Sequence, residues 1–368
     1  MRRSVQVAAG WAGGIALLIG MPLLGVRLSG GAIAPYLEMP PRTDFVLHAP
    51  FSWPAFLGLA AFLALILLPF VIRVGAGMSV RPAQADSRLY PFPIWGWVAV
   101  GCGLAIWLLA WTRLPWFKLV QPFTFTPLWL SYIVVMNALV IRRTGRSPLT
   151  HRTGAFLALF PVSAAFWWFF EYLNRFVQNW HYIGIGPLSA GDYVLRATLP
   201  FATVLPAFVA TRAWLASFPG LWTRLAAWYP VRPVHPRRLA WLALAASAAG
   251  LAGIGIWHEV LFPLLWVSPL MVIGAIRVLT GHATLLSGPA RGDWRPLVMA
   301  AAAALMCGFF WEMWNVFSLE KWIYTVPFVD RFHVFEMPLL GYAGYLPFGV
   351  ECALVAEWVG RTGQEDAP

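Results

Sequence analysis

Long apolar runs separated by short polar segments make up most of this chain. A helix needs about 20 apolar residues to cross the hydrocarbon core of a bilayer. Ten runs come close to that length, so the pattern predicts ten transmembrane helices. They lie near residues 8–28, 53–73, 93–112, 126–142, 154–173, 193–214, 239–257, 261–279, 296–314 and 339–358.

The first run resembles a secretory signal but differs from one in two respects. It follows Arg2 and Arg3, and Ala32-Ile33-Ala34 downstream imitates a signal-peptidase site. Its apolar core is longer than the roughly 7–15 residues of a signal peptide, and Pro35 stands where cleavage would release the new amino terminus. We therefore interpret the run as a retained signal anchor.

The positions of the basic residues predict the orientation of the helices, because cytoplasmic loops retain Lys and Arg. With the amino terminus inside, 18 of the 26 basic residues lie in cytoplasmic segments and eight lie outside. Both termini are then cytoplasmic, in a membrane of the bacterial inner (plasma) membrane type. The eight outer residues are Arg27, Arg42, Arg113, Lys118, Arg175, Arg196, Lys321 and Arg331.

The second half of the chain repeats the pattern of the middle. Phe170-Glu171-Tyr172-Leu173-Asn174 recurs as Trp311-Glu312-Met313-Trp314-Asn315 at an offset of 141, and Pro206-Ala207-Phe208-Val209 answers Pro347-Phe348-Gly349-Val350 at the same offset. Eight helices therefore form two four-helix units that enter the membrane in the same direction, as in parallel-repeat transporters. The predicted organisation is two leading helices in 1–92, the first unit in 93–216, a basic linker in 217–238, the second unit in 239–358 and a polar tail in 359–368.

Composition agrees with this all-α polytopic membrane class. Hydrophobic residues make up 60% of the chain and charged residues 11%, whereas soluble domains carry about 45–50% and 25%. The net charge of +11 follows from the cytoplasmic loops, so no nucleic-acid partner is expected. Disorder, collagen and coiled coil are excluded by the same figures. Three cysteines in apolar runs imply no disulfide framework, and no nucleophile or phosphate-loop motif occurs.

A carboxylate and an amide recur near the outer ends of two equivalent helices. Glu171 and Asn174 are three residues apart, as are Glu312 and Asn315, so each pair lies on one helical face. A carboxylate at the apolar boundary is costly to bury, and such residues usually face a bundle interior or a cavity. The recurrence of the pair favours a functional site. The structural alternative, to which we give equal weight, is that each Glu and Asn hydrogen-bonds the end of its own helix or another helix of the bundle.

The motif Trp-x-Tyr follows each pair, as Trp180-His181-Tyr182 and Trp322-Ile323-Tyr324. Aromatic belts at the membrane surface account for such residues in most polytopic proteins. The functional alternative is a lid whose rings cover a cavity and whose Tyr hydroxyl reaches the Glu. Both interpretations place these loops outside.

The second unit carries more ionisable groups than the first. Its outer loop contains His333 and Glu336, and Glu351 lies inside its last helix, opposite Ala210 of the first unit. A single active site would therefore belong mainly to the second unit. His258, Glu259, His333 and Glu336 have the residue types of a zinc or iron site, but no known ligand spacing, so neither a metal nor another cofactor is predicted.

An acid at a helix end, then Trp-x-Tyr, then Phe335-Glu336-Met337-Pro338 at the next helix, resembles the membrane-bound carotenoid cyclases and hydratases over about 50 residues of each unit. Those families have a Pro-x-Glu-Glu element, whereas here Pro follows the Glu and the paired acid is missing, so membership is not assigned. The resemblance implies one chemistry: an intramembrane carboxylic acid that protonates an isoprenoid double bond.

Three functions remain open from the sequence. The first is action on a lipidic or isoprenoid substrate in an outer-leaflet cavity, the second is a transporter or flippase that uses the same acids, and the third is a scaffold subunit without chemistry. Membrane lipids are the expected partners, and the oligomeric state is not predicted. The candidate catalytic residues are Glu312, Glu336, Asn315, Tyr324, Glu171 and Asn174, and the candidate substrate-binding residues are Trp180, Tyr182, Trp322 and His333.

Overall fold

The computed structural model describes residues 2–40, 43–78, 89–282 and 285–365. Within these ranges the chain is mostly helical, with 15 α-helices. Arg42, Arg81 and Arg88, which entered the orientation argument, lie outside the described residues, as does the end of the predicted polar tail. The α-helices are α1 (Arg2–Leu28), α2 (Ala34–Leu37), α3 (Trp53–Met78), α4 (Ile94–Trp111), α5 (Phe125–Thr144), α6 (Pro148–His151), α7 (Thr153–Val177), α8 (Ala190–Phe201), α9 (Val204–Ala216), α10 (Pro219–Trp222), α11 (Pro236–Ile254), α12 (His258–Leu261), α13 (Leu264–Leu279), α14 (Arg295–Asn315) and α15 (Tyr345–Glu365).

Every predicted apolar run is helical, but fewer than ten are long and apolar enough to cross a membrane. Among the described residues eight meet that requirement: α1, α3, α4, α5, α7, the joined α8 and α9, α14, and α15 with the 3-10 turn before it. α13 is shorter, with 16 residues, and α11 carries Arg237 and Arg238 in its first turn. The predicted count of ten membrane spans is therefore not confirmed. The prediction of a mostly helical chain with several helices able to span a membrane is confirmed.

Several of these helices expose apolar side chains on the molecular surface. Leu65, Val71 and Ile72 of α3 are exposed, as are Trp97 and Leu108 of α4. Exposed apolar surface of this extent marks contact with lipid or a partner rather than with water. The apolar helices thus fit an integral membrane protein of the multi-pass kind.

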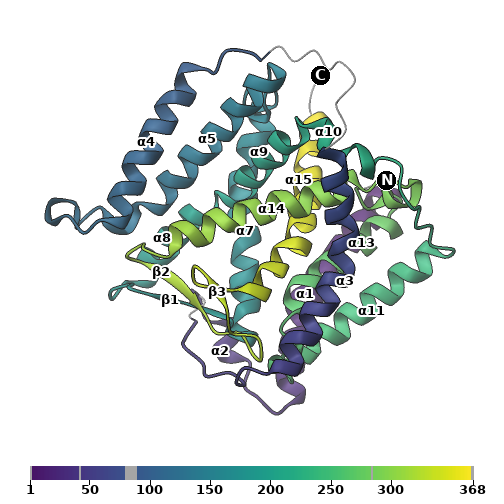
Figure 1. The fold of residues 1–368 in the computed structure, drawn as a ribbon. Coiled ribbons are helices and arrows are strands. Elements are labelled where there is room, and N and C mark those ends of the chain that lie inside the picture. The colour runs from purple at the N-terminus through teal and green to yellow at the C-terminus, as the bar shows by residue number, and fades with distance from the viewer. Residues whose placement is uncertain (1, 41–42, 79–88, 283–284, 366–368) are drawn as a thin grey trace.

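The helices of the two predicted units pack on one another in matching ways. α7 packs against α9 and α15, and α14 packs against the same two helices. The core between them is aromatic, with Trp129, Phe170, Phe208 and Phe348 fully buried. In Figure 1 these four helices occupy the centre, flanked by α4 and α5 on one side and by α1, α3 and α11 on the other.

Four short strands make the fold less purely helical than the sequence predicted. β1 (Trp180–Ile183) pairs antiparallel with β2 (Lys321–Tyr324), and β3 (His333–Val334) pairs with β4 (Met337–Pro338). The prediction of an all-α fold is corrected at these points. Backbone N–H and C=O groups outside helices need other partners. Those of β1 pair with β2, which is far away in sequence, and those of β3 pair with β4 in a short hairpin.

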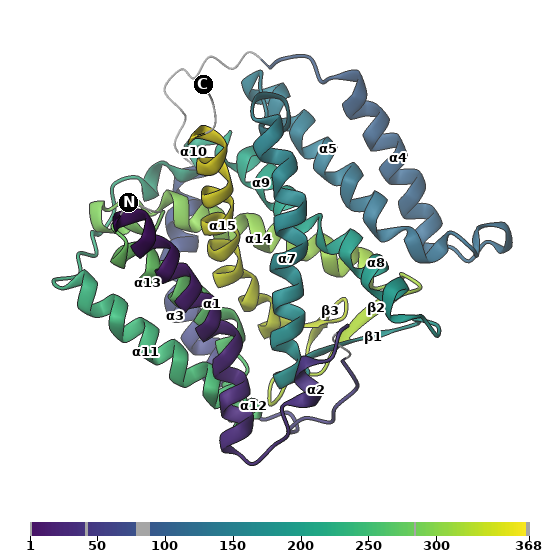
Figure 2. The same ribbon diagram turned by 180° about the vertical axis from the view of Figure 1, so that it is seen from behind.

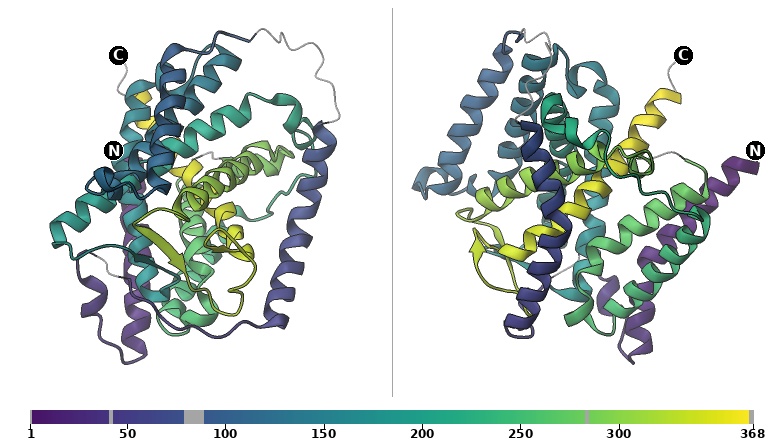
Figure 3. Two further views of the ribbon diagram at one scale, coloured as in Figure 1. Left: turned by 60° about the vertical axis from the view of Figure 1, so that its left-hand side comes forward. Right: turned by 45° about the vertical axis from the view of Figure 1, so that its right-hand side comes forward.

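Both ends of the described chain lie on the same side of the molecule. Figures 1 and 2 show the two termini at one end of the bundle and the strands, α2 and α12 at the opposite end. Figure 3 shows α3 standing apart from α4, with the strands between them at the lower end. We call the end that carries the strands the strand face.

Candidate functional site

Glu171 lies near the end of α7 at the strand face and is fully buried, with 1% of its surface exposed. One of its oxygens, Oε1, accepts three hydrogen bonds. The donors are Trp167 Nε1 at 3.0 Å, Trp180 Nε1 at 3.1 Å and Tyr182 Oη at 2.6 Å. Trp167 is one turn earlier on the same helix, whereas the other two donors come from β1, so the carboxyl group joins α7 to the strand.

Glu312 occupies the matching place on α14 and is completely buried. Its Oε1 accepts hydrogen bonds from Tyr324 Oη and Tyr345 Oη, each at 2.7 Å. Trp322 Nε1 donates in turn to Tyr324 Oη at 2.8 Å. Both Glu side chains therefore have the Tyr–Glu hydrogen bond that the lid alternative requires.

The second carboxyl oxygen is unused at both sites. Oε2 of Glu171 and Oε2 of Glu312 are buried without a hydrogen-bond partner among the described residues. A buried polar atom without a partner costs free energy, and such atoms often mark positions with a function beyond stability. The two carboxyl groups share this feature as well as their place in the fold.

The amide of each Glu-x-x-Asn pair binds the backbone of the strand. Asn174 Nδ2 donates to Trp180 O at 2.7 Å and its Oδ1 accepts from Asn179 N, while Asn315 Nδ2 donates to Trp322 O at 2.7 Å and its Oδ1 accepts from Trp322 N at 3.0 Å. Both Asn side chains are buried. The amides therefore fix the position of the Trp-x-Tyr segments.

The strand pair explains the spacing of Trp-x-Tyr. Side chains of a strand alternate between its two faces, and the register sets Trp180 opposite Tyr324 and Tyr182 opposite Trp322. All four aromatic side chains consequently share one face of the ribbon, and the intervening His181 and Ile323 share the other. The aromatic face turns toward α7 and α14, where the two Glu side chains lie.

Each carboxyl group also accepts a hydrogen bond from a helical residue, and this donor differs: Trp167 for Glu171 and Tyr345 for Glu312. At an offset of 141, Trp167 corresponds to Gly308 and Val204 to Tyr345. A Cβ atom on Gly308 would lie 2.4 Å from the Tyr345 ring, so the phenol of α15 fills space on α14 that a larger side chain would occupy. An indole from the same helix serves Glu171, and a phenol from the following helix serves Glu312.

A partly open cavity of about 200 Å³ lies over these groups. Its lining is mainly apolar and aromatic, and it includes every Trp and Tyr that donates to Glu171 or Glu312. The two carboxyl groups are one layer deeper, so the hydroxyl groups of the tyrosines connect them to the cavity. The lining residues are Pro122, Phe123, Phe125, Thr126, Trp167, Trp180, Tyr182, Ile185, Leu188, Tyr193, Arg196, Ala197, Leu199, Pro200, Phe201, Val204, Trp266, Trp311, Glu320, Lys321, Trp322, Tyr324, Met337, Gly341, Gly344 and Tyr345.

The charged residues of the lining form ion pairs. Arg196 Nη1 lies 2.9 Å from Glu320 Oε1, and Lys321 Nζ pairs with Glu336. Burial raises the pKa of Glu320, and the neighbouring Arg196 only partly offsets this effect. These pairs thus contribute little net charge to the cavity.

The tyrosines of the strand pair remain hydrogen-bond donors over the whole physiological range. Burial, followed by the nearby Glu171, raises the pKa of Tyr182 well above its ordinary value, and burial followed by Glu312 does the same for Tyr324. A neutral phenol can donate its own proton and accept another. Each tyrosine can therefore pass a proton between the cavity and a buried carboxyl group.

The remaining predicted residues lie away from this core. His333 is exposed on β3, bonded to Asp330 at 2.8 Å, and it does not line the cavity. Glu336 lies in the turn between β3 and β4 and pairs with Lys321 of the cavity lining. The described residues contain no cluster of His, Cys, Asp and Glu that could hold a metal ion, and the four residues weighed as a metal site are divided among separate contacts.

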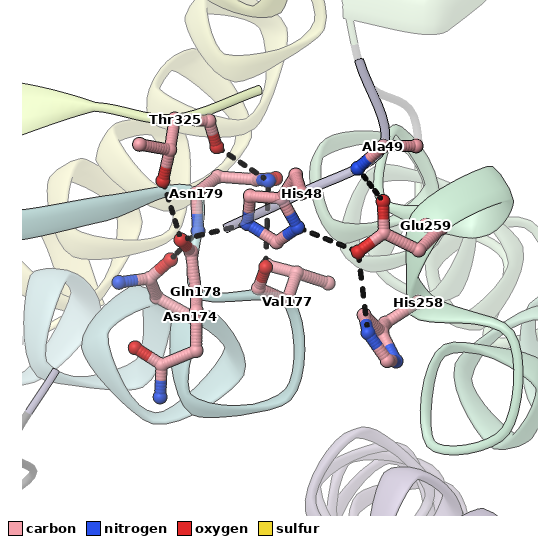
Figure 4. A network of polar contacts seen from close by, with 9 residues as sticks. All are labelled: His48, Ala49, Asn174, Val177, Gln178, Asn179, His258, Glu259 and Thr325. Atoms are coloured by element: carbon pink, nitrogen blue, oxygen red, sulfur yellow. Dashed lines mark hydrogen bonds and ion pairs between the residues drawn. The ribbon is translucent and has the colours of Figure 1, made fainter. Parts of the chain in front are cut away.

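His258 and Glu259 belong to a different polar network, drawn in Figure 4. Glu259 Oε1 lies 2.6 Å from His48 Nδ1 and 3.4 Å from His258 Nε2, and its Oε2 accepts from Ala49 N at 2.9 Å. His48 Nε2 lies 3.2 Å from Gln178 O. The network attaches the segment before α3 to the end of α7 and to α12.

Trp167, Tyr345 and the aromatic wall that includes Trp266 and Trp311 are not among the residues predicted from the sequence. The sequence spacing could have identified Trp167, because it precedes Glu171 by four residues and so shares its helical face. No such pattern marks Tyr345, because its counterpart in the predicted repeat is Val204. No protein-family model, curated protein or solved structure matches this chain.

Proposed function

We propose that this protein is an integral membrane enzyme that acts on a lipidic substrate bound in the aromatic cavity. The observation that carries the proposal is the connection between the cavity and two buried carboxyl groups through tyrosine hydroxyls. Apolar pockets with a few convergent polar groups are the usual form of a small-molecule site. An apolar lining of this kind favours the hydrocarbon part of a lipid or isoprenoid.

In the proposed reaction Tyr324 contacts the substrate, and Glu312 exchanges protons with Tyr324. When Tyr324 Oη takes a proton from a substrate hydroxyl or carbon acid, its own proton passes to Glu312 Oε1, which lies 2.7 Å away. The reverse transfer delivers a proton to the substrate. Tyr345 donates to the same oxygen and holds the carboxyl group in place, and the surrounding rings exclude water.

Glu171 and Tyr182 form the equivalent pair in the first unit. Their hydrogen bond is 2.6 Å long, but two indole donors also occupy the same oxygen of Glu171. Asn174 and Asn315 position the strands, while Trp180, Trp322 and Tyr182 shape the substrate site. Glu336 acts through Lys321 at the rim, and His333 lies outside the proposed site.

The proposed architecture has ten membrane segments, of which the last eight form two parallel four-helix units, 93–216 and 239–358. The matching Asn–Trp and Tyr–Glu contacts and the shared packing of α7 and α14 support a twofold relation between the units. Both termini are proposed to be cytoplasmic, in an inner membrane of bacterial type, so that the cavity opens toward the outer leaflet. The common position of the termini, opposite the strand face, supports an even number of crossings.

A transporter or flippase is the second candidate, and Glu351 favours it. This residue of α15 is completely buried, its Oε1 accepts from Leu270 N at 3.0 Å, and its Oε2 has no partner among the described residues. A carboxyl group in this position, away from the cavity, suits a proton site on a transport path. If transport is the function, Glu351→Gln abolishes it, whereas an enzyme confined to the cavity tolerates this change.

The test is conversion of lipid by the purified full-length protein. Wild-type protein is reconstituted in vesicles of a total membrane lipid extract that includes isoprenoids, and the lipids are followed by mass spectrometry over time. At least one lipid species should change, and Glu312→Gln should abolish the change while the protein remains folded. An unchanged lipid profile under these conditions contradicts the enzyme proposal.

A matched pair of α8 variants tests whether the cavity is the site. Ala197 lines the cavity, whereas Leu195 is exposed and does not line it. Ala197→Trp fills the cavity and should prevent conversion, and Leu195→Trp should leave it intact. Equal activity of the two variants would place the reaction elsewhere.

A further inference from the structure

The floor of the cavity is built from indole and phenol rings. Five of its tryptophans are Trp167, Trp180, Trp266, Trp311 and Trp322. Trp180 and Trp266 are stacked with centroids 5.8 Å apart, and Trp167 lies 6.5 Å from both Trp180 and Trp311. The faces of aromatic rings carry negative electrostatic potential, and a cation that loses its water is attracted to them.

The charges around the floor also favour a cation. The basic side chains of the lining, Arg196 and Lys321, are each neutralised by an acid. Behind the floor lie the carboxyl groups of Glu171 and Glu312, each with one free oxygen. An anionic headgroup would therefore meet ring faces and acids, whereas a cation would meet attraction from both layers.

The two carboxyl groups are not equally compensated. Arg175 follows Glu171 by one helical turn, and its guanidinium donates to the carbonyl oxygens of Tyr36 and Glu38. The groups bonded to Glu312 are two phenols, which are neutral. The side of the cavity next to Glu312 is consequently the more favourable place for positive charge.

The polar atoms of the floor decide which kind of cation fits. The N–H groups of Trp167 and Trp180 and the O–H groups of Tyr182, Tyr324 and Tyr345 donate to the carboxyl oxygens. Trp322 Nε1 donates to Tyr324 Oη, so the floor presents mainly ring faces and few acceptors. A primary ammonium has three N–H donors that each need an acceptor. A quaternary ammonium has none, and aromatic cages are well suited to it.

We propose that the cavity binds an amphiphile with a quaternary ammonium headgroup, whose methyl groups pack on the tryptophan rings and whose chain lies along the apolar wall. Leu199, Phe201 and Ile185 belong to that wall. This inference rests on the proposed function, since it takes the same cavity as the substrate site. It adds the charge and the chemical class of the ligand.

The test compares three probes with the same chain length. Tetradecyltrimethylammonium, tetradecanol and tetradecyl sulfate are titrated into the full-length protein in a nonionic detergent, and binding is followed by calorimetry and tryptophan fluorescence. The quaternary ammonium should bind at least about tenfold more tightly than the alcohol, and the sulfate should bind more weakly than either. Ala197→Trp should abolish binding, which separates occupancy of the cavity from partition into the micelle.

Two tryptophan variants give the matched control. Trp266→Leu removes a ring of the floor and should weaken the quaternary ammonium several-fold more than it weakens the alcohol. Trp241, which is 62% exposed on α11 and does not line this cavity, serves as the control, and Trp241→Leu should change neither affinity. Equal binding of alcohol and ammonium, or preference for the sulfate, would overturn the inference but leave the cavity as a lipid site. If none of the probes binds, both the inference and the proposed function fail.

Discussion

At the scale of single residues, Glu171 and Glu312 occupy matching places on α7 and α14 but receive hydrogen bonds from different kinds of donor. Both are buried carboxyl groups with one oxygen bonded and one free. Two of the three donors of Glu171 are indoles, which cannot accept a proton, whereas both donors of Glu312 are phenols, which can. Proton exchange with the cavity is therefore better served at Glu312.

Glu312→Gln should abolish activity while the folded protein stays in the membrane, because Gln keeps the size of the side chain but not its ionisable proton. Glu171→Gln should reduce activity less. Activity and thermal melts in detergent measure the two effects. If both acids only tie strands to helices, either change should cost about 1 kcal/mol of stability, the order of one net hydrogen bond, and activity should survive in both variants.

Glu259 gives a prediction for the pH dependence of stability. Burial by itself raises the pKa of this side chain, but the hydrogen bonds from His48 and from Ala49 N–H, together with His48 and His258 as neighbouring charges, outweigh it and lower the pKa. A lowered pKa contributes stability above the unfolded value, and that contribution is lost as the pH falls through the folded value.

Thermal melts between pH 7 and pH 3 should therefore show a loss of stability on the acid side that is smaller in Glu259→Gln than in the wild type. The variant should also be less stable than the wild type near pH 7, because the pair with His48 is gone. Parallel curves for the two proteins would show that the network in Figure 4 does not contribute to acid sensitivity.

At the scale of elements, the helices could be predicted and the strands could not. Apolar runs are local, so α3 and α14 follow from the sequence within a few residues. Trp180, Tyr182 and Ile183 are residue types that favour strands, but four residues are too few to predict one, and β1 forms because β2 pairs with it from far along the chain. The spacing Trp-x-Tyr was visible, but its cause, one aromatic face of a ribbon, depends on a partner strand.

The candidate site shows the same limit. Glu171 and Glu312 could be selected because they recur at one offset, and Tyr182 and Tyr324 because they follow at similar distances. Tyr345 could not be selected, because its role depends on the space left by Gly308 on the neighbouring helix. A contact made in only one of the two predicted units has no counterpart at the offset of 141, so comparing the two halves of the sequence cannot find it.

The pair Gly308 and Tyr345 can be tested directly. Gly308→Ala would place a Cβ atom 2.4 Å from the ring and push the phenol away from Glu312, which should cost roughly 1–3 kcal/mol as overpacking does. Gly101 of α4 has no atom within 4 Å of the added Cβ, so Gly101→Ala should leave stability unchanged or raise it slightly. Chemical denaturation of both variants in detergent measures the difference, and equal stability would contradict the packing described.

At the scale of the whole molecule, the termini and the strand face should lie on opposite sides of the membrane. Ser189 is exposed near β1, and Val234 is exposed before α11. In a Cys102→Ala background, Ser189→Cys should react with an impermeant thiol reagent in intact cells, and Val234→Cys should react only after lysis. The reverse pattern would invert the proposed orientation, and labelling of both sites in intact cells would contradict the opposition itself.

The pairing of β1 with β2 also sets an order of assembly. Asn179 and Thr325 are joined across 146 positions of the chain, so β1 has no partner strand until nearly the whole protein has been synthesised. Contacts so distant in sequence form late, because the long loop between them must close first. The cavity therefore acquires its floor only after α14 and β2 have been made and have folded against the rest of the chain. Until then the buried carboxyl group of Glu171 lacks the paired strands that cover it.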